Sequence, residues 1–352
     1  MVRAGSASVS AGPMLAVVAR EAGVSVPTAS KVVNGREDVA PETRRRVTEA
    51  LDRLGYARRP RFDTVQTPGL VDLVVHSLEN SCSGAVLHGV EAAAYEAGLE
   101  VVVSAGLTRA RAGRPERDWL NRLTARGSSG VLFNLAELSP AQYAWLDHHR
   151  IPYVLIDPAH EPPAGVVSVG AANWQGGVSA TEHLLGLGHR RIAVIAGRRR
   201  TLCGSARVAG YRSALASAGL RYRAEYVRHA GFDETAARRC THGLLDLPEP
   251  PTAVFVCSDR MARGVYEALA ERGLRVPGDM SVVGFDDLPE ARWAAPALTT
   301  VRQPLGEMAA TALRLLVRMM HGERPEGTRT ELSTRLVPRA STAVPPEERP
   351  PA

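Results

Sequence analysis

Residues 18–34, VAREAGVSVPTASKVVN, predict two short helices joined by a tight turn. Gly23 can take the left-handed backbone conformation that ends a helix, and Ser25 is a favourable N-cap for the next helix. A small apolar face of the first helix is expected from Ala16, Val17, Ala19 and Ala22. Helix, glycine turn, helix is the geometry of a DNA-binding helix-turn-helix, although ordinary all-α domains also contain such corners.

The second helix, residues 26–33, is predicted to have distinct inner and outer faces. Its inward side chains are Ala29, Val32 and Val33, and its outward ones are Val26, Pro27, Thr28, Ser30 and Lys31. A third helix is expected over residues 41–54, with Val47, Leu51 and Leu54 on one face. Three short helices at one end of a long chain favour a small DNA-binding head.

The charge distribution agrees with such a head. The 352-residue chain has a net charge of +6, and residues 1–70 hold 11 Lys and Arg against 7 Asp and Glu, which is +4 of that total. A basic end on a near-neutral body suits a partner that is a polyanion. Arg is also used almost throughout in place of Lys, so a compositional preference for Arg explains part of the excess.

Cysteine spacing and hydropathy exclude several classes of protein. Cys82, Cys203, Cys240 and Cys257 form no CxxC pair, so neither a zinc site nor a disulfide framework is expected. The N-terminus lacks the apolar core of a signal peptide, and no apolar run reaches membrane-spanning length. We therefore expect a cytoplasmic protein with no membrane association and no cofactor.

From residue 70 onward, short β-branched runs alternate with helical patterns. This alternation is typical of parallel sheets in doubly wound α/β layers. About 270 residues exceed one such unit, so we expect two α/β subdomains with a ligand cleft at the carboxyl ends of their strands. The expected strands are residues 70–76, 99–104, 130–134, 152–157, 166–170, 191–197, 252–258 and 280–286.

These patterns divide the chain into five parts. The head covers residues 14–56, a basic linker covers 57–69, and the α/β core covers 70–340. Residues 1–13 and 341–352 are expected to be disordered tails because they are small or rich in Pro and Glu.

Several blocks of the sequence resemble the lactose/galactose repressor (LacI/GalR) family in its usual order. They are VAREAGVSVPTASKVVNG (18–35), VAPETRRRVTEALDRLGY (39–56), ATEHLLGLGHRRIAVIAG (180–197), ARVAGYRSALASAGL (206–220), AVFVCSDRMARGVYEAL (253–269), VPGDMSVVGFDDLPEA (276–291) and LTTVRQP (298–304). The resemblance implies a helix-turn-helix head on a periplasmic-binding-protein-like core. It also implies a homodimeric repressor that binds a near-palindromic operator and is controlled by a small effector, a mono- or oligosaccharide.

The resemblance assigns DNA-contacting residues in the head and linker. Val26, Pro27 and Lys31 lie where the family reads base edges, and Lys31 can donate to guanine or to a phosphate. Phosphate contacts or capping are expected from Ser25, Thr28, Ser30 and Asn34, and backbone contacts from Arg58, Arg59 and Arg61. The head departs from the family at Met14, Val17 and Ala40, where caps are usual, and the linker offers Phe62 or Val65 as its apolar wedge.

Effector contacts follow from the resemblance in the same way. It implies that Arg207 forks onto the ligand, Asp286 accepts from ligand hydroxyls and Phe232 packs on a ligand ring. The further candidates are Glu79, Ser81, Asn134, Asp157, Ser258, Asp259 and Gln303. The alternatives are that Asp259 and Asp287 cap helices and that Arg207 pairs with an acid.

Three classes of function can be compared. A sugar-binding protein of the same core fold would lack effective operator binding, and a sugar transport protein would have a signal peptide. An enzyme would need a phosphate loop, a full glycine fingerprint or a catalytic set around Asp286 and Asp287, and the sequence contains none. The sequence therefore predicts a repressor that is not an enzyme, with a sugar effector and a purine as the alternative ligand.

Overall fold

A computed structural model of the chain describes residues 15–33, 39–54, 69–105 and 117–346. The chain divides into two compact units, residues 1–67 and 68–352. The predictions for Asn34, Arg58, Arg59 and Arg61, for the linker wedge and for the first tail lie outside the described residues.

Within the described residues, the first unit contains three helices, α1 (Leu15–Glu21), α2 (Val26–Val33) and α3 (Pro41–Arg53), as predicted. Gly23 has φ +63°, and the Ser25 hydroxyl accepts from the backbone N–H of Thr28 at 3.3 Å, so the turn and its cap form as expected. The buried core consists of Val18, Ala19, Ala22, Ala29, Val32, Val39, Val47 and Ala50. The predicted face of α1 was wrong at Ala16, which is exposed. Val18 is buried instead. It lies four positions before Ala22, and residues three or four positions apart share one side of a helix.

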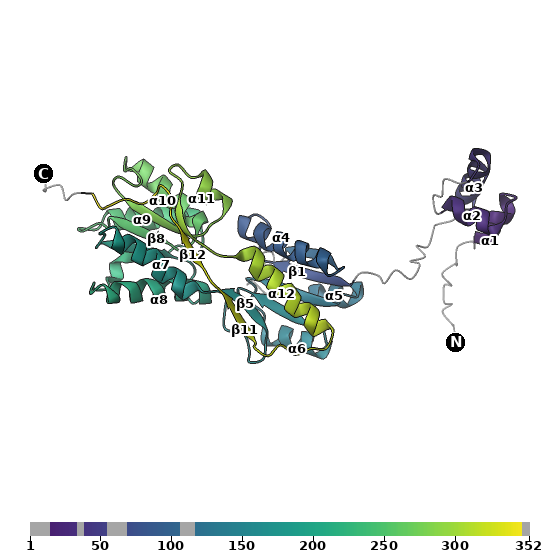
Figure 1. Ribbon diagram of the computed structural model, residues 1–352, viewed down its shortest axis with the longest axis horizontal. Coiled ribbons are helices and arrows are strands. Elements are labelled where there is room, and N and C mark those ends of the chain that lie inside the picture. Colours follow the sequence, from purple (N-terminus) through teal and green to yellow (C-terminus); the bar gives the residue numbers. More distant parts are fainter. Residues whose placement is uncertain (1–14, 34–38, 55–68, 106–116, 347–352) are drawn as a thin grey trace, which may run out of the picture. The chain divides into compact units, whose positions relative to one another are not determined.

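The described part of the second unit contains two six-stranded sheets. All strand pairs of the first sheet are parallel, in the order β11-β5-β4-β3-β1-β2. Its strands are β1 (Leu70–Val75), β2 (Glu100–Ala105), β3 (Gly130–Asn134), β4 (Tyr153–Ile156), β5 (Ser168–Ala171) and β11 (Arg329–Leu332). Its helices are α4 (Ser81–Glu96), α5 (Arg117–Arg126), α6 (Pro140–His148) and α12 (Leu305–Met320), and we call this layered set the first subdomain. Helices α4 and α12 lie side by side against the sheet (Figure 1).

The second subdomain has the strand order β12-β10-β9-β8-β6-β7. Its strands are β6 (Ile192–Ala196), β7 (Val227–His229), β8 (Ala253–Val256), β9 (Ser281–Asp286), β10 (Thr299–Arg302) and β12 (Arg335–Val337). Its helices are α7 (Asn173–Gly186), α8 (Leu202–Ser217), α9 (Glu234–Leu245), α10 (Asp259–Glu271) and α11 (Pro289–Trp293), with a short 3-10 turn η1 (Ala224–Tyr226). The sheets are not wholly parallel as predicted, because β12 pairs antiparallel with β10.

The chain crosses between the subdomains three times in the described residues. The crossings run from β5 to α7, from β10 to α12 and from β11 to β12. In Figure 1 the segment from β11 to β12 runs from one lobe into the other. Several short crossings between two lobes are typical of a hinge about which domains close on ligands.

The predicted disorder from residue 341 was wrong for the first part of that tail. The Ser341 hydroxyl donates to Val282 O at 2.6 Å and accepts from Thr299 N–H at 2.7 Å. Ala343 N–H donates to Ser281 Oγ at 3.0 Å, and its carbonyl lies 3.0 Å from the buried ring of His189. The segment is rich in Pro and Glu only after this point, so composition placed the boundary a few residues too early.

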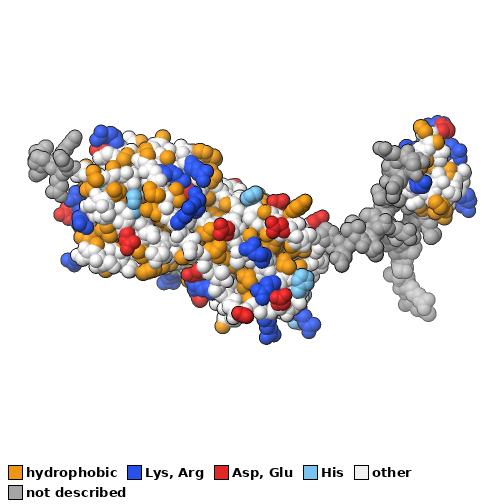
Figure 2. Space-filling view, viewed as in Figure 1, with side chains coloured by type: hydrophobic (Ala, Val, Ile, Leu, Met, Phe, Trp, Pro, Cys, Tyr) orange, Lys and Arg blue, Asp and Glu red, His pale blue; other side chains and the backbone are white. Residues whose placement is uncertain are grey.

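Charged side chains are spread over the surface of the second unit. On the face seen in Figure 2, basic and acidic side chains are interspersed with hydrophobic ones. No helix in the described part of the chain has both the length and the hydropathy to cross a membrane.

Candidate functional site

The outer face of α2 is the candidate DNA-reading surface. Val26 is 44% exposed, and Pro27 and Lys31 are exposed as well, whereas Thr28 and Ser30 are half-buried. Pro27 falls in the first helical turn, where its missing N–H costs no hydrogen bond. The Ser25 and Thr28 hydroxyls lie 2.8 Å apart, so both belong to the cap at the start of α2.

Part of the positive charge of the head is used internally. Arg46 of α3 donates to the carbonyls of Ala22 and Gly23, the latter at 3.1 Å, and so fixes the turn before α2. Arg53 pairs with Glu21 at 2.7 Å. The sequence did not reveal the role of Arg46, because an arginine among arginines carries no distinguishing signal.

Arg207 of α8 is the centre of a buried polar cluster in the second unit. Its side chain is 3% exposed. Its Nε donates to Asn173 Oδ1 at 2.8 Å and one terminal nitrogen donates to Cys257 O at 2.7 Å. The same nitrogen lies 3.5 Å from Asp286 Oδ1, and the guanidinium carbon lies 3.6 Å from the centre of the Phe285 ring. The expected alternative for Arg207, pairing with an acid, is therefore present.

Asp286 ends β9 and faces this guanidinium. Burial raises its pKa to about 6, even though Arg207 and the hydrogen bond from Gln303 favour the ionised form. Gln303 Nε2 donates to Asp286 Oδ1 at 2.6 Å. The other amide atom of Gln303, Oε1, is buried and meets no hydrogen-bond partner in the described part of the chain. A buried acceptor without a donor is costly, and a ligand hydroxyl or N–H would satisfy it.

Asp157 joins the cluster from the first subdomain, where it follows β4 with φ +48°. Burial raises the pKa of Asp157, while Arg207 and a hydrogen bond with Asn173 oppose the shift. Asn173, at the start of α7, therefore connects Asp157 with Arg207. Asn173 was missed in the sequence, where only its place directly after a strand could have marked it.

Three predicted residues, Ser258, Asp259 and Phe232, have contacts within the fold, and a fourth, Asn134, is buried. Ser258 caps α10 by accepting from Met261 N–H at 3.2 Å. Asp259 accepts from Leu288 N–H at 2.9 Å and from the Thr300 hydroxyl at 2.6 Å, so it braces the loop after β9. Asn134 is buried at the end of β3. Phe232 packs on Gly197, where an added Cβ would lie 2.1 Å from the ring.

The alternative role of Asp287, capping a helix, was wrong. Asp287 pairs with Arg302 and Arg339 at 2.5 Å each, and Leu288 is the residue that precedes α11. Both arginines come from segments that cross or close the second sheet, β10 and the residues after β12. Asp287 therefore ties the end of β9 to the C-terminal part of the chain.

Ser81 and Glu79 lie after the first strand, as predicted, but differ in their surroundings. Glu79 is exposed. The Ser81 hydroxyl donates to Glu290 of the second subdomain, a hydrogen bond that spans the two subdomains. The second carboxylate oxygen of Glu290 is buried without a partner among the described residues. Nothing in the sequence around Glu290 had indicated this contact.

Three thiols surround the same cluster. Burial raises the pKa of Cys203 to about 11 and that of Cys257 to about 12, and it raises the pKa of Cys82 as well, with Arg207 opposing the shift in each case. They are protonated at neutral pH and are poor nucleophiles. The described residues contain no group of His, Cys, Asp or Glu suited to a metal ion.

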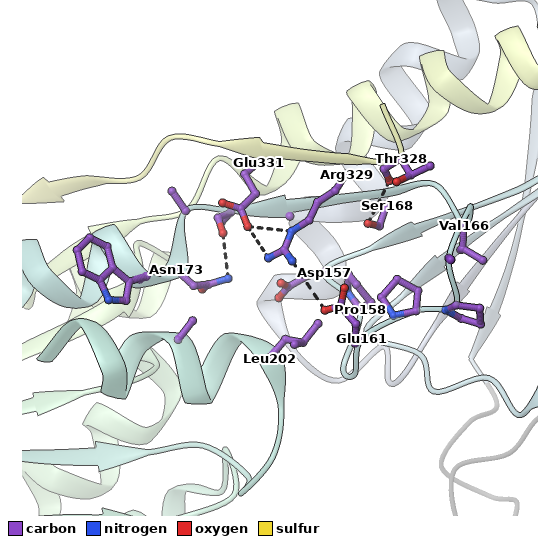
Figure 3. A pocket seen from close by; sticks show the side chains of 18 of the residues that line it. Asp157, Pro158, Glu161, Val166, Ser168, Asn173, Leu202, Thr328, Arg329 and Glu331 are labelled. Carbon is purple, nitrogen blue, oxygen red and sulfur yellow. Dashed lines mark hydrogen bonds and ion pairs between the residues drawn. The ribbon is translucent and has the colours of Figure 1, made fainter. Parts of the chain in front are cut away.

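A cavity of about 340 Å³ adjoins the cluster. Asp157 and Asn173 belong to the polar cluster and also line the cavity. The other walls of the cavity include Arg329 and Glu331 of β11 and Leu202 of α8 (Figure 3). Arg329 pairs with Glu331 at 2.6 Å and with Glu161 at 3.8 Å. Among the predicted effector residues only Asp157 lines this cavity, so the cavity and the polar cluster meet at one wall.

Comparison with known proteins gives consistent matches over nearly the whole chain. Residues 15–59 match the family described as "Bacterial regulatory proteins, lacI family", and residues 181–342 match the "Periplasmic binding protein-like domain". The HTH-type transcriptional regulator CelR of Thermobifida fusca is 36% identical over 338 residues, which cover 94% of this chain and 98% of that protein.

Two solved structures extend this comparison. The structure of a transcriptional regulator CelR-cellobiose complex has a TM-score of 0.69 and 34% identity, and the match covers 94% of this chain and 99% of that one. The lac repressor dimer bound to operator and the anti-inducer ONPF has a TM-score of 0.71 and 27% identity, with 95% and 100% covered.

Proposed function

Because this chain belongs to the lacI family of bacterial regulatory proteins, we propose that it is a transcriptional repressor controlled by a sugar. It acts in the cytoplasm as a homodimer that binds a near-palindromic operator. One short helix such as α2 makes few base contacts, and a two-fold dimer doubles them. The solved relatives, one with cellobiose and one with operator, support both halves of the proposal.

The observation that carries the effector proposal is the open acceptor of Gln303. Its Oε1 is buried and has no hydrogen-bond partner among the residues that the structure describes, and Asp286 accepts from the same side chain. Sugar hydroxyls both donate and accept, so one ring can satisfy Gln303 Oε1 and Asp286 together. Asp157, Asn173 and Arg207 belong to the same polar cluster, since Asn173 interacts with Asp157 and Arg207, and Arg207 faces Asp286.

The proposed switch uses the three crossings between the subdomains. Asp157 comes from the first subdomain and Asp286 from the second, so a ligand bound by both favours one relative angle. A ligand shifts the equilibrium only by its difference in affinity for the two angles. Through a dimer, that angle sets the spacing of the two heads and hence operator affinity.

Fluorescence anisotropy on labelled DNA from upstream of its own gene tests the proposal, at fixed salt and with a panel of sugars. We expect tight, sequence-selective binding that one sugar shifts. The variant Lys31→Met should weaken operator binding and leave sugar binding unchanged. The variant Gln303→Met should weaken sugar binding and leave operator binding unchanged. Weak binding with a steep salt dependence and no response to any sugar would refute the proposal.

A purine is the alternative effector and is tested in the same assay. Flat purine rings need an aromatic platform, and Phe232 is the candidate for it. A purine that binds while every sugar fails would replace the sugar in this proposal and leave the repressor function intact.

A further inference from the structure

The loop that joins β6 to α8 carries three successive arginines, Arg198, Arg199 and Arg200, and we call these three residues the arginine loop. All three are exposed. The Thr201 hydroxyl donates to Arg198 O at 3.0 Å, and the ring of His160 lies 3.2 Å from Arg200 O. The backbone of the loop is therefore held, while its side chains are left to the surface.

The arginine loop lies at the junction of the two subdomains. From the first subdomain, His160 contacts the loop at Arg200 O. Ala159, two residues after Asp157, accepts from the N–H of Leu202 at 2.9 Å, just beyond the loop. Arg198 also lies close enough to His76, at the end of β1, to lower its pKa. Helix α8, which starts directly after the loop, carries Arg207. The loop thus lies along the edge where the carboxyl ends of β1, β4 and β6 meet, which is where ligands of such sheets bind.

The ionisable side chains that contact the arginine loop or feel its charge are His76, His160 and His229, and His160 also lies 3.5 Å from Glu137. Among the described residues, no carboxylate forms an ion pair with Arg198, Arg199 or Arg200. Burial lowers the pKa of His76 and of His229, and the charges of Arg198 and Arg199 respectively lower them further. Like charges gathered without a counterion repel one another, and an anion bound among them would remove that repulsion.

The charge of Arg207 is not available to a ligand anion in the same way. It donates to Asn173 and Cys257 O and faces the Asp286 carboxylate. The acceptors around it, Asp157, Asp286 and Gln303 Oε1, call for ligand hydroxyls. The inner part of the site therefore fits a neutral polyol, and the arginine loop fits an anionic group at one end of it.

We propose that the effector is an acidic sugar, whose phosphate or carboxylate is bound by the arginine loop while its hydroxyls contact Asp286 and Gln303. This inference rests on the proposed sugar-responsive function and deepens it. Guanidinium groups bind phosphate and carboxylate oxygens with charge-assisted, often paired hydrogen bonds. The ligand class differs from that of the relative whose structure holds cellobiose, a neutral disaccharide.

Matched ligands test this assignment by isothermal titration calorimetry on the full chain. Each hexose or cellobiose in the panel is compared with its 6-phosphate and, where one exists, its uronate. We expect an acidic member to bind at least about tenfold more tightly than its neutral parent, the difference that one or two charge-assisted hydrogen bonds provide. The phosphate and uronate arms show which anion the loop accepts.

A triple variant assigns the difference to the loop. Arg198→Gln, Arg199→Gln and Arg200→Gln together should remove the preference for the acidic ligand and leave the affinity for the neutral parent unchanged. The control combines Arg190→Gln, Arg239→Gln and Arg324→Gln, three exposed arginines away from the loop, and should keep the preference despite the same change in net charge.

The outcomes separate this inference from the proposed function. A neutral sugar that binds as tightly as its acidic derivatives, or a preference that survives in the loop variant, overturns the acidic-sugar assignment and keeps the repressor. Equal loss in the loop and control variants would mean a general charge effect and would overturn it too. If no sugar of either kind binds, the proposed sugar effector itself fails.

Discussion

Asp286 and Asp287 are adjacent in the chain but have opposite electrostatic surroundings. Burial raises the pKa of Asp286 to about 6. For Asp287, burial is outweighed by hydrogen bonds and charges from Arg339 and Arg302, which lower its pKa. In the folded state one carboxyl therefore binds its proton more tightly than in the unfolded chain, and the other more weakly.

These shifts predict opposite pH signatures for two similar substitutions. A raised folded-state pKa gives stability below the unfolded value, near 4, that is lost as the pH rises to about 6. The unfolding free energy of the wild type relative to Asp286→Asn should fall over this window, by at most about 3 kcal/mol. Relative to Asp287→Asn, the wild type should instead lose stability as the pH falls below about 4. Urea unfolding of the wild type and the two variants at a series of pH values measures both effects. If the unfolding free energy had the same pH dependence in all three proteins, the opposite pKa shifts of Asp286 and Asp287 would be contradicted.

Among individual residues, the sequence predicted some members of the candidate site and missed others. Arg207, Asp286 and Gln303 were found by resemblance, since spacing alone does not bring residues 207, 286 and 303 together. Asn173 and Glu290 were missed because each acquires its role from a partner far along the chain, Arg207 and Ser81 respectively. Local pattern cannot reveal such a partner.

The contact between helices α7 and α8 depends on glycines at which the backbones nearly touch. An added Cβ at Gly210 would lie 2.1 Å from Trp174 O, and one at Gly177 would lie 2.3 Å from Arg207 O. Gly210→Ala should therefore destabilise the protein by about 1–3 kcal/mol through overpacking and weaken effector binding, since α8 carries Arg207. Gly243→Ala in α9 is the matched control, because nothing lies within 4 Å of its added Cβ.

That control should instead gain about 0.5–1 kcal/mol from helix propensity. Urea unfolding of the two variants measures the difference. If both variants gained stability, α7 and α8 could not be packed as closely as described.

The cap of α2 gives a prediction for the head. Ser25→Ala should cost about 1 kcal/mol of head stability and weaken operator binding, with effector affinity unchanged. Ser25→Gly distinguishes capping from a phosphate contact, because Gly is tolerated at an N-cap almost as well as Ser. Anisotropy should show operator binding largely restored in the glycine variant, whereas equal losses would assign the hydroxyl to DNA.

Most long elements could be predicted from the sequence, whereas β10 and the short edge strands β7, β11 and β12 were not. Runs such as residues 130–134 and 280–286 are β-branched and bounded by turns, so their strands were found. Strands β7, β11 and β12 read VRH, RTEL and RLV, which have too few apolar residues to show a period. Their strand conformation comes from hydrogen bonding to a neighbour already in the sheet.

Across the whole second unit, the hydrogen bond from Ser81 to Glu290 joins the two subdomains in one relative arrangement. Ser81→Ala should shift the equilibrium between subdomain arrangements away from this one. It should therefore weaken, by a few fold, the binding of an effector that favours this arrangement. Glu290→Gln keeps an acceptor for Ser81 and should restore most of the affinity. Calorimetry gives the affinities, and small-angle scattering with and without effector gives the change in shape. Identical effector affinity in all three proteins would rule out a role for this contact in the switch.

The first subdomain is assembled from two distant parts of the chain, residues 69–171 and the α12–β11 segment near the other end. During synthesis the ribosome must therefore complete nearly the entire second subdomain before the first can close its sheet. The head, by contrast, is a separate unit that precedes the second unit in the chain and emerges before it. Each nascent polypeptide thus acquires its DNA-reading unit before its sensing unit.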